Sequence, residues 1–295
     1  MRTVIITGAS DGIGAAAARS LAGSDTRLVL VGRAPIKTRV VAEELGVECH
    51  VVDYSRLDEV RSLAANLLDS LDRIDVLANN AGGIFDGPTL TVDGFEKTFQ
   101  VNHLAQFLLT NLLIERLLAS RATVVNTSSI AARMFARLNL DDLNGVSAFN
   151  PLKAYGNAKL GNILFTKGLH ERFHTQGLST VAFHPGNIAT NFAANTRHSL
   201  HLMYHTVAKR FLVPVATGGE RLAHFINGRP GETWASGEYY GTKLTVARTN
   251  PMAYDPAVVR RHWEVSVEML GSAAPLVERP VGPGSHIAAV DLTAT

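Results

Sequence analysis

The chain has 295 residues, of which 46% are apolar and 18% are charged, and its formal net charge at pH 7 is +2. This composition supports a large buried core and gives no sign of a polyanionic partner such as nucleic acid. The single cysteine excludes both an intramolecular disulfide framework and the cysteine clusters of structural zinc sites. The first predicted strand begins at Thr3, which leaves no room for a signal peptide, and no run of about 18 apolar residues marks a membrane span. We therefore expect a cytoplasmic protein.

Residues 3–6 form an apolar, β-branched run, followed by a glycine-rich segment and then by apolar residues at helical spacing. This order predicts a strand, a tight turn and a helix. The spacing G-x-x-x-G-x-G differs from the commoner dinucleotide-binding spacing G-x-G-x-x-G and also fits an ordinary turn. As a binding turn, Gly8 would permit the bend, Gly12 would let the backbone approach a pyrophosphate, and Gly14 would allow close helix packing. We expect the phosphates at the positive N-terminus of the helix, on Gly8, Ser10, Asp11, Gly12, Ile13 and Gly14.

The end of the second predicted strand, near 27–31, indicates which dinucleotide binds. In NAD-binding proteins, the position about 20 residues beyond the glycine-rich turn carries Asp or Glu, which reads the ribose 2′-hydroxyl. This chain has Gly32 there, followed by Arg33. A guanidinium without a neighbouring carboxylate favours a 2′-phosphate, which predicts NADP(H) as the cofactor, with Lys37 adding charge. The alternative is that Arg33 is an ordinary solvated loop cation.

Strands near 3–7, 27–31, 49–52, 74–78, 122–126, 179–183 and 238–241 alternate with helical patterns. Such alternation predicts an α/β fold, a doubly wound parallel sheet of the Rossmann type with about seven strands, helices on both faces and the ligand at the carboxyl ends of the strands. A helix predicted over 93–119 carries a stripe that we interpret as core or dimer packing, formed by Phe95, Phe99, Leu104, Phe107, Leu108 and Leu112. We expect one domain over residues 1–270 and an extended tail over 271–295.

Tyr155 and Lys159 are four residues apart in a predicted helix, so their side chains stand one turn above each other. An unperturbed phenol has a pKa near 10, which is too high for efficient proton exchange near neutrality, and a neighbouring ammonium lowers that pKa. Tyr155 is therefore a candidate acid or base. Because Tyr and Lys at this spacing are common on helix surfaces, the pair alone is weak evidence for catalysis. The glycine-rich turn in the same chain strengthens that evidence.

From residue 3 to about residue 270 the chain resembles the short-chain dehydrogenase/reductase family. Beyond the glycine-rich turn and the Tyr/Lys pair, the resemblance rests on segments 79–82 (Asn-Asn-Ala-Gly), 101–104 (Val-Asn-His-Leu), 126–129 (Asn-Thr-Ser-Ser) and 184–186 (His-Pro-Gly), which occur in family order. It implies a tetrad of Asn102, Ser129, Tyr155 and Lys159, with Ser128 as the alternative to Ser129. It also implies cofactor contacts from Asp53, Asn80, Ala81, Gly82, Tyr155, Lys159, Pro185, Gly186, Ile188 and Thr190.

Several segments look like the retinol-dehydrogenase-like branch of that family, namely 91–96, 102–104, 141–143, 154–160 and 236–240. This branch implies a bulky, lipophilic carbonyl or alcohol as substrate, of the retinoid or polyketide kind. Protochlorophyllide reductases share the scaffold. They depend on cysteines near their pigment, whereas Cys49 lies in the cofactor half of this chain, which weakens that alternative.

Two segments are candidates for covering a substrate. Ser129 and Tyr155 are 26 positions apart, about twice the separation in compact family members, and the extra chain either lies over the pocket entrance or is a tolerated surface insertion. Residues 191–213 are the expected substrate lid, with an apolar stripe opposite His198, His201 and His205. We interpret these histidines as a solvated face rather than a zinc site, and we expect no metal. A third interpretation is that the stripe rests on a membrane surface.

We conclude that the sequence predicts an NADP(H)-dependent oxidoreductase that transfers hydride between the nicotinamide and a lipophilic carbonyl, with a homo-oligomer as an open alternative to a monomer. In this mechanism Tyr155 supplies the proton, Ser129 polarises the carbonyl, and Lys159 tunes Tyr155 and binds the nicotinamide ribose by family analogy. The rival from another class is a catalytically idle NADP(H)-binding redox sensor or scaffold with the same fold.

Overall fold

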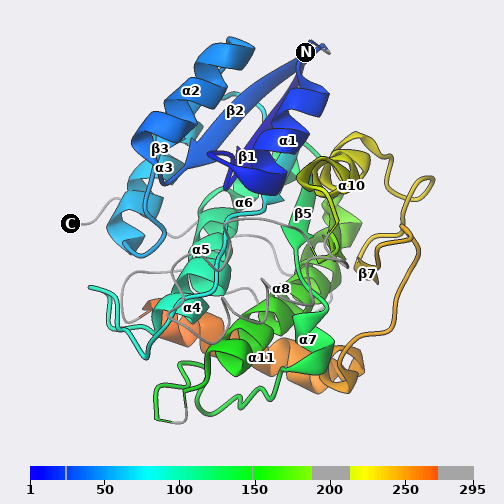
Figure 1. The fold of residues 1–295 in the computed structure, drawn as a ribbon. Helices are drawn as coiled ribbons and strands as arrows, with labels where there is room; N and C mark the ends of the chain where they lie inside the picture. The colour runs from blue at the N-terminus through cyan, green and yellow to red at the C-terminus, as the bar shows by residue number, and fades with distance from the viewer. Residues whose placement is uncertain (24, 148, 188–212, 272–295) are drawn as a thin grey trace.

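The computed structural model describes residues 1–23, 25–147, 149–187 and 213–271, and its centre is a parallel sheet of seven strands (Figure 1). The sheet order is β3-β2-β1-β4-β5-β6-β7, and every neighbouring pair is parallel. The predicted doubly wound sheet is thus confirmed. Its strands are β1 (Arg2–Thr7), β2 (Thr26–Gly32), β3 (Glu48–Val51), β4 (Val76–Asn79), β5 (Thr123–Thr127), β6 (Ser179–Phe183) and β7 (Glu238–Tyr240).

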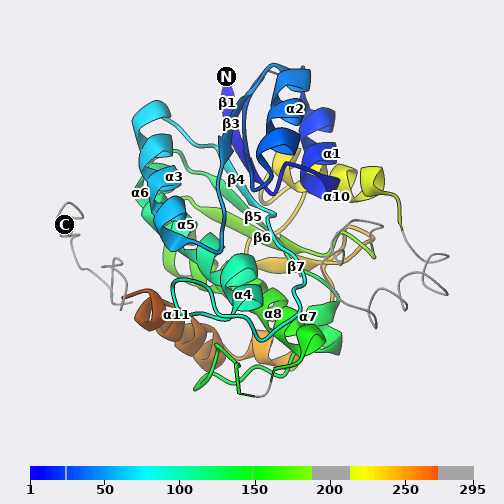
Figure 2. The ribbon, with the colours of Figure 1, turned by 60° about the vertical axis from the view of Figure 1, so that its left-hand side comes forward.

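Both faces of the sheet are covered, as Figure 2 shows, because the central strands are apolar on both sides. In β1, Val4 and Ile6 point into one cluster of buried side chains, while Ile5 points into the other. The order of strands reverses between β1 and β4, and the crevice at such a switch point is where doubly wound sheets bind ligands.

The first face is covered by α1 (Gly12–Leu21), α2 (Pro35–Leu45) and α10 (Val215–Asn227), which lie together in Figures 1 and 2. Helices α1 and α10 touch closely at Gly219, where an added Cβ atom would lie 2.5 Å from the Ala16 Cβ atom. This close approach fixes α1 and the glycine-rich turn that precedes it.

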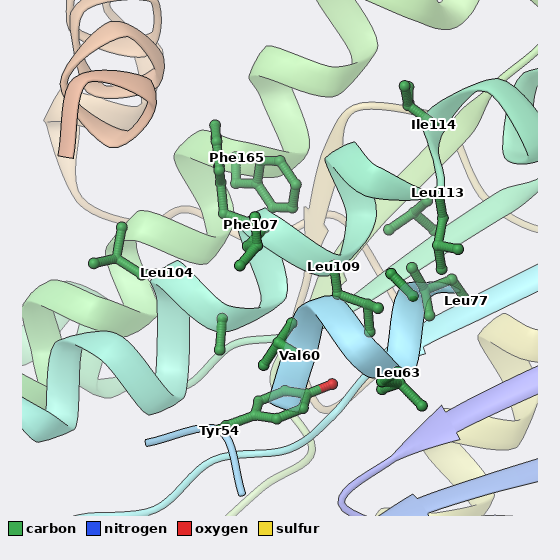
Figure 3. Close-up of a cluster of buried hydrophobic side chains, with 14 of the residues drawn as sticks. Tyr54, Val60, Leu63, Leu77, Leu104, Phe107, Leu109, Leu113, Ile114 and Phe165 are labelled. Atoms are coloured by element: carbon green, nitrogen blue, oxygen red, sulfur yellow. The ribbon is translucent and has the colours of Figure 1, made fainter. Parts of the chain in front are cut away.

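The second face is covered by α3 (Leu57–Ser70), α5 (Ala105–Leu112), α6 (Ile114–Ala119), α8 (Pro151–Phe173) and α11 (Pro256–Gly271). Figure 3 shows side chains of α3, α5, α6 and α8 near Leu77 of the sheet, with Phe107 beside Phe165. The ring centroids of Phe107 and Phe165 are 4.8 Å apart, and Trp263 of α11 lies 4.9 Å from Phe107. Helix α8, which carries Tyr155 and Lys159, is therefore held rigidly from several sides.

The single helix predicted over 93–119 is wrong in detail. Glu96 caps a first turn, α4 (Lys97–Phe99), by accepting from the backbone N–H groups of Thr98 and Phe99 at 2.9 Å each. A π-helical segment, η1 (Gln100–Leu104), follows before α5 and α6, with a break at Leu113. The Asn102 side-chain amide donates to the Thr98 carbonyl at 2.8 Å, and the backbone N–H of Ala105 donates five residues back to the Gln100 carbonyl. The apolar stripe is buried or packed against the core, as the core interpretation predicts.

The remaining short elements are α7 (Ala131–Met134), η2 (His174–Gln176) and η5 (Pro251–Tyr254). Within the described ranges, none of the helices is both long and apolar enough to cross a membrane.

Candidate active site

A cavity of about 380 Å³ opens at the carboxyl end of the sheet. Six strands are each directly followed by a residue that lines the cavity, namely Gly8 after β1, Arg33 after β2, Val52 after β3, Asn80 after β4, Ser128 after β5 and His184 after β6. Tyr155 and Lys159 line the same cavity from α8. The parallel topology thus brings together residues that are widely separated in sequence.

The glycine-rich turn forms one end of the cavity, and its glycines serve backbone geometry. Gly8 and Gly12 have φ values of 67° and 57°, in the left-handed region that disfavours side chains. A Cβ atom on Gly14 would lie 2.4 Å from the Gly8 carbonyl oxygen, so Gly14 allows α1 to start directly against the turn. Gly14 itself is not in the cavity lining, whereas Gly8, Ser10, Asp11, Gly12 and Ile13 all are.

Asn80 holds the glycine-rich turn to the neighbouring strands. Its side-chain amide donates to the Thr7 carbonyl at 3.0 Å, and its side-chain oxygen accepts from the Thr127 hydroxyl at 3.1 Å. Asn80, Ala81 and Gly82 line the cavity, as the resemblance implies. Asn79 instead points into the core, where it donates to Thr110 and Asn126.

Arg33 and Lys37 line the cavity at the end of β2 and are both exposed. Lys37 pairs with Asp11 at 2.7 Å, whereas Arg33 has no ion-pair partner within the described part of the chain. At Gly32, a Cβ atom would lie 2.4 Å from the Thr38 hydroxyl and 2.9 Å from the Ser10 Cβ atom. The carboxylate that NAD-binding proteins use at this position therefore has no room here.

Asp53 lines the same end of the cavity, beyond β3. Its carboxylate accepts from the Ser55 backbone N–H at 2.9 Å, and its own backbone N–H donates to Glu59 at 2.7 Å. The side chain is thus part of a closed turn that shapes the wall.

Tyr155 and Lys159 lie on consecutive turns of α8, which begins at Pro151 with Asn150 as its cap. The Lys159 Nζ atom is 5.7 Å from the centroid of the Tyr155 ring. Only 2% of Lys159 is exposed, and its Nζ atom donates to the Thr127 carbonyl at 3.1 Å. Burial lowers the pKa of Lys159 to about 7, so this amine is the most strongly perturbed cation of the cavity.

The two serines after β5 have different hydrogen bonds. The Ser128 hydroxyl is buried and donates to the Lys159 carbonyl at 2.8 Å. The Ser129 hydroxyl accepts from the Ala131 backbone N–H at 3.2 Å, which leaves its proton for an acceptor in the cavity. This geometry favours Ser129 over Ser128 as the donor to a substrate.

Asn102 is not in the cavity lining. Its side chain donates to the Gly83 and Thr98 carbonyls at 2.7 and 2.8 Å and accepts from the Gly83 N–H at 3.1 Å. Gly82 is pressed against it, because an added Cβ atom would lie 2.4 Å from the Asn102 Oδ1 atom and 3.1 Å from the Lys159 Nζ atom. Asn102 therefore supports the wall behind Lys159.

Pro185 and Gly186 line the cavity next to β6, and Gly186 has a φ of 110°. Arg221 of α10 donates to the Pro185 carbonyl, and the Gly186 N–H donates to His184 Nδ1 at 3.3 Å. Burial, with Arg221 nearby, lowers the pKa of His184 to about 4, so this loop is held by a neutral imidazole.

The Tyr155 ring packs in an apolar cluster, of which Ile84 and Tyr155 itself line the cavity. Ile84 and Ala131 are buried against Tyr155, and Phe135 and Leu152 pack on the same cluster. The extra chain between Ser129 and Tyr155 packs largely elsewhere. None of its described residues lines the cavity, Leu143 is buried in the core, and Asn144 accepts from the Glu96 N–H at 2.6 Å.

Some predicted sites lie outside the described residues. They are Ile188, Thr190, residues 191–212 of the expected lid with its apolar stripe and histidines, and the tail from residue 272 onward. Asn187 and Val213 flank the undescribed stretch 188–212. The Val213 N–H donates to the Asn187 carbonyl at 2.8 Å, and Asn187 lines the cavity.

Sequence reasoning missed Thr127, whose carbonyl receives the Lys159 amine, and the buried Asn162 and His103 beyond it. A main-chain carbonyl has no sequence signal. His103 follows Asn102 in segment 101–104, which is one of the segments that carry the family resemblance. The sequence signal that could have identified it is a polar residue on an otherwise apolar helix face.

Comparisons with known proteins agree with this geometry. Residues 2–201 match the family described as short chain dehydrogenase. A protein of Streptomyces sp. (strain C5) named "Putative daunorubicin C-13 ketoreductase DnrU" is 38% identical over 280 residues, which cover 92% of this chain and 94% of that protein. Human retinol dehydrogenase 13 is 34% identical over 293 residues, which cover 95% of this chain and 88% of the human protein.

Among solved structures, the crystal structure of an uncharacterized protein from Mycobacterium paratuberculosis has a TM-score of 0.74 to this chain. The two are 31% identical, and the match covers 92% of this chain and 94% of the other.

The buried imidazoles predict a specific pH dependence of stability. Burial lowers the pKa of His103 to about 4 and that of His262 well below its ordinary value. Unfolded histidine titrates near 6.5, so below that pH the unfolded state binds more protons than the folded state. These groups therefore leave the free energy of unfolding unchanged above pH 6.5 and decrease it as the pH falls toward 4.

Substituting His262→Phe removes one of these groups. The loss of unfolding free energy between pH 7 and pH 5 should become smaller than in the wild type by about 2 kcal/mol. Urea unfolding at the two pH values, followed by circular dichroism, measures this difference. An identical pH dependence in both proteins would show that His262 is accessible to protons in the folded state.

Proposed function

This chain belongs to the short-chain dehydrogenase family, in the branch of its retinol dehydrogenase relatives, and we propose that it interconverts a carbonyl and an alcohol with NADP(H) on a bulky, lipophilic substrate. The observation that carries the proposal is that Ser129, Tyr155 and Lys159 converge on the same cavity as the glycine-rich turn and Arg33. A catalytically idle binding protein has no chemical need for this convergence.

The residues fit a nicotinamide dinucleotide. The left-handed Gly8 and Gly12 and the N-terminus of α1 would hold the pyrophosphate, since no side chain projects from the turn at those glycines. Arg33 would pair with a 2′-phosphate, and the lack of room for an acid at Gly32 supports NADP(H) over NAD(H). The bound cofactor supplies hydride exchange at C4 of its nicotinamide.

The protein supplies the proton and the orientation. Tyr155 donates its phenolic proton to the substrate oxygen during reduction, and Ser129 donates a hydrogen bond to the same oxygen as negative charge develops there. A protonated Lys159 near the Tyr155 ring favours the phenolate that remains. Because burial brings the pKa of Lys159 to about 7, additional acceptors such as ribose hydroxyls would favour its charged form.

The apolar residues of the cavity support the substrate class. Ile84 and Phe85 line the cavity near Tyr155 and can offer only shape and apolar contact to a substrate at that position, while Ala131, Phe135 and Leu152 pack around the Tyr155 ring outside the lining. We propose that segment 191–213 is a substrate lid, because Asn187, which precedes the undescribed stretch 188–212, lines the cavity and accepts from the Val213 N–H at 2.8 Å.

Cofactor preference should depend on Arg33. Arg33→Asp removes an ion pair to the 2′-phosphate and adds repulsion, so the NADPH dissociation constant should rise by at least about tenfold while that for NADH stays constant or falls. Fluorescence titration measures both. Arg39→Asp, at an exposed position of α2 outside the cavity lining, is the control. A wild type that prefers NADH would contradict the assignment.

Turnover should depend on the Tyr155 hydroxyl. Tyr155→Phe keeps the ring and removes the proton donor, so kcat should fall by about 10²–10⁴ while NADPH affinity changes little. The control is Tyr254→Phe, which removes a hydroxyl outside the cavity lining. Steady-state kinetics with a reactive ketone decides the matter, and near-normal turnover by the Tyr155 variant would remove this residue from the mechanism.

Substrate size should control efficiency. Each further buried methylene contributes about 0.8 kcal/mol, so kcat/KM should rise about fourfold per methylene along a ketone series until the pocket is full. Phe85→Ser, at an apolar residue that lines the cavity, should flatten the rise, while Val40→Ser on the exposed face of α2 should not. Best activity on small polar carbonyls would contradict the substrate class.

A further inference from the structure

We infer that His103 is a positioning residue for Lys159, because it orients the Asn162 side chain that shares the Thr127 carbonyl with the Lys159 amine. The inference rests on the proposed function, in which Lys159 acts on Tyr155. It assigns a role to a buried histidine that touches neither the cavity nor, in the described residues, any other part of the proposed catalytic site.

A continuous chain of hydrogen bonds leads from the cavity into the core. The Thr127 carbonyl accepts from the Lys159 Nζ atom at 3.1 Å and from the Asn162 Nδ2 atom at 3.2 Å. The Asn162 Oδ1 atom lies 3.3 Å from His103 Nδ1, and His103 Nε2 lies 3.2 Å from the Ser266 hydroxyl on α11. Lys159, Asn162, His103 and Ser266 are each at most 2% exposed, and Thr127 is 6% exposed.

The donors and acceptors in this series of hydrogen bonds fix the orientation of Asn162. The Thr127 carbonyl can only accept, so the amide nitrogen of Asn162 must face it. The amide oxygen must then face His103, and it needs a donor there because an unsatisfied buried acceptor costs about 1–3 kcal/mol. His103 Nδ1 is the group in position to donate.

The same reasoning fixes the tautomer of His103. Nδ1 carries the proton that is given to Asn162, so a neutral ring must accept at Nε2. The Ser266 hydroxyl lies 3.2 Å from Nε2 and 2.8 Å from the His262 carbonyl, and this tautomer requires that it turn its single proton to Nε2. The ring is neutral because burial lowers the pKa of His103 to about 4. Within the ranges that the structure describes, the remaining titratable groups around Lys159 and His103 are Tyr155, His184 and His262.

The position of His103 against α8 depends on a glycine. Lys159 and Asn162 are three residues apart and lie on the same side of α8. Between them, a Cβ atom on Gly161 would lie 3.1 Å from His103 Nδ1 and 3.2 Å from His262 Nε2. The absence of a side chain at Gly161 lets both imidazoles pack directly on the helix that carries the catalytic pair.

His262 offers a matched control within the same cluster. Its ring centroid is 4.7 Å from that of His103, and it is also fully buried. Neither of its ring nitrogens has a hydrogen-bond partner among the described residues. His262→Phe therefore reports the effect of packing alone, whereas His103→Phe also removes the donor to Asn162.

The first arm of the test needs no activity. Nitrogen-15 NMR of the wild-type holoprotein should show His103 as the neutral Nδ1–H tautomer between pH 6 and pH 8. A neutral Nε2–H tautomer or a charged ring would overturn the inference, whether or not the proposed function holds.

The second arm measures kinetics with NADPH and a lipophilic ketone. His103→Phe should lower kcat about tenfold, as expected for one lost buried hydrogen bond, with KM and NADPH affinity within about twofold of wild type. It should also raise the apparent pKa of the pH–kcat profile by about 0.5 unit, because a displaced Lys159 favours the phenolate less. His262→Phe should leave kcat and the profile unchanged, and His103→Gln, which keeps a donor, should recover most of kcat.

Equal effects of the two phenylalanine substitutions, or no recovery by His103→Gln, would overturn the inference and assign His103 to packing. A wild type without turnover would instead contradict the proposed function, and the NMR arm would still decide the orientation of His103.

Discussion

The amine of Lys159 is buried beside the end of β5 and is almost inaccessible to solvent. The hydrogen bonds around it follow from that burial. An amine at such a depth needs acceptors, and the last carbonyl of β5 supplies one. That carbonyl belongs to Thr127, whose hydroxyl bonds to Asn80, which in turn holds the glycine-rich turn. The proposed cofactor site and the proposed catalytic site are therefore parts of a single hydrogen-bonded structure.

Close packing makes this arrangement possible. At Gly8 and Gly14 a side chain would collide with neighbouring backbone, and at Gly82 it would collide with the Asn102 side chain. At Gly161 it would press on two imidazoles. The helices that carry these contacts are themselves fixed by two apolar clusters, one on each face of the sheet. A cavity with fixed walls can orient a substrate and a cofactor without reorganising when they bind.

The sequence predicted the sheet well, because its strands are short apolar runs separated by turns and helical patterns. It also predicted the residues that follow the strands, such as Arg33 and Asn80, since topology alone brings strand ends together. It did not predict the π-helical segment around Asn102, because all five of its residues are buried and leave no alternation of apolar and polar residues to reveal it. Nor did it predict the contacts of Lys159 with Thr127 and Asn162, since they depend on a main-chain carbonyl and on tertiary packing.

The central claim is that this cavity transfers hydride from NADPH to a lipophilic carbonyl. Single-turnover reactions with NADPH deuterated at either the R or the S position of C4, followed by mass spectrometry of the alcohol, test it most directly. The account predicts that one of the two labelled forms places deuterium on the carbinol carbon of a bulky ketone. Tight NADPH binding without labelled alcohol from either form would contradict it and would indicate a protein that binds the cofactor without using it.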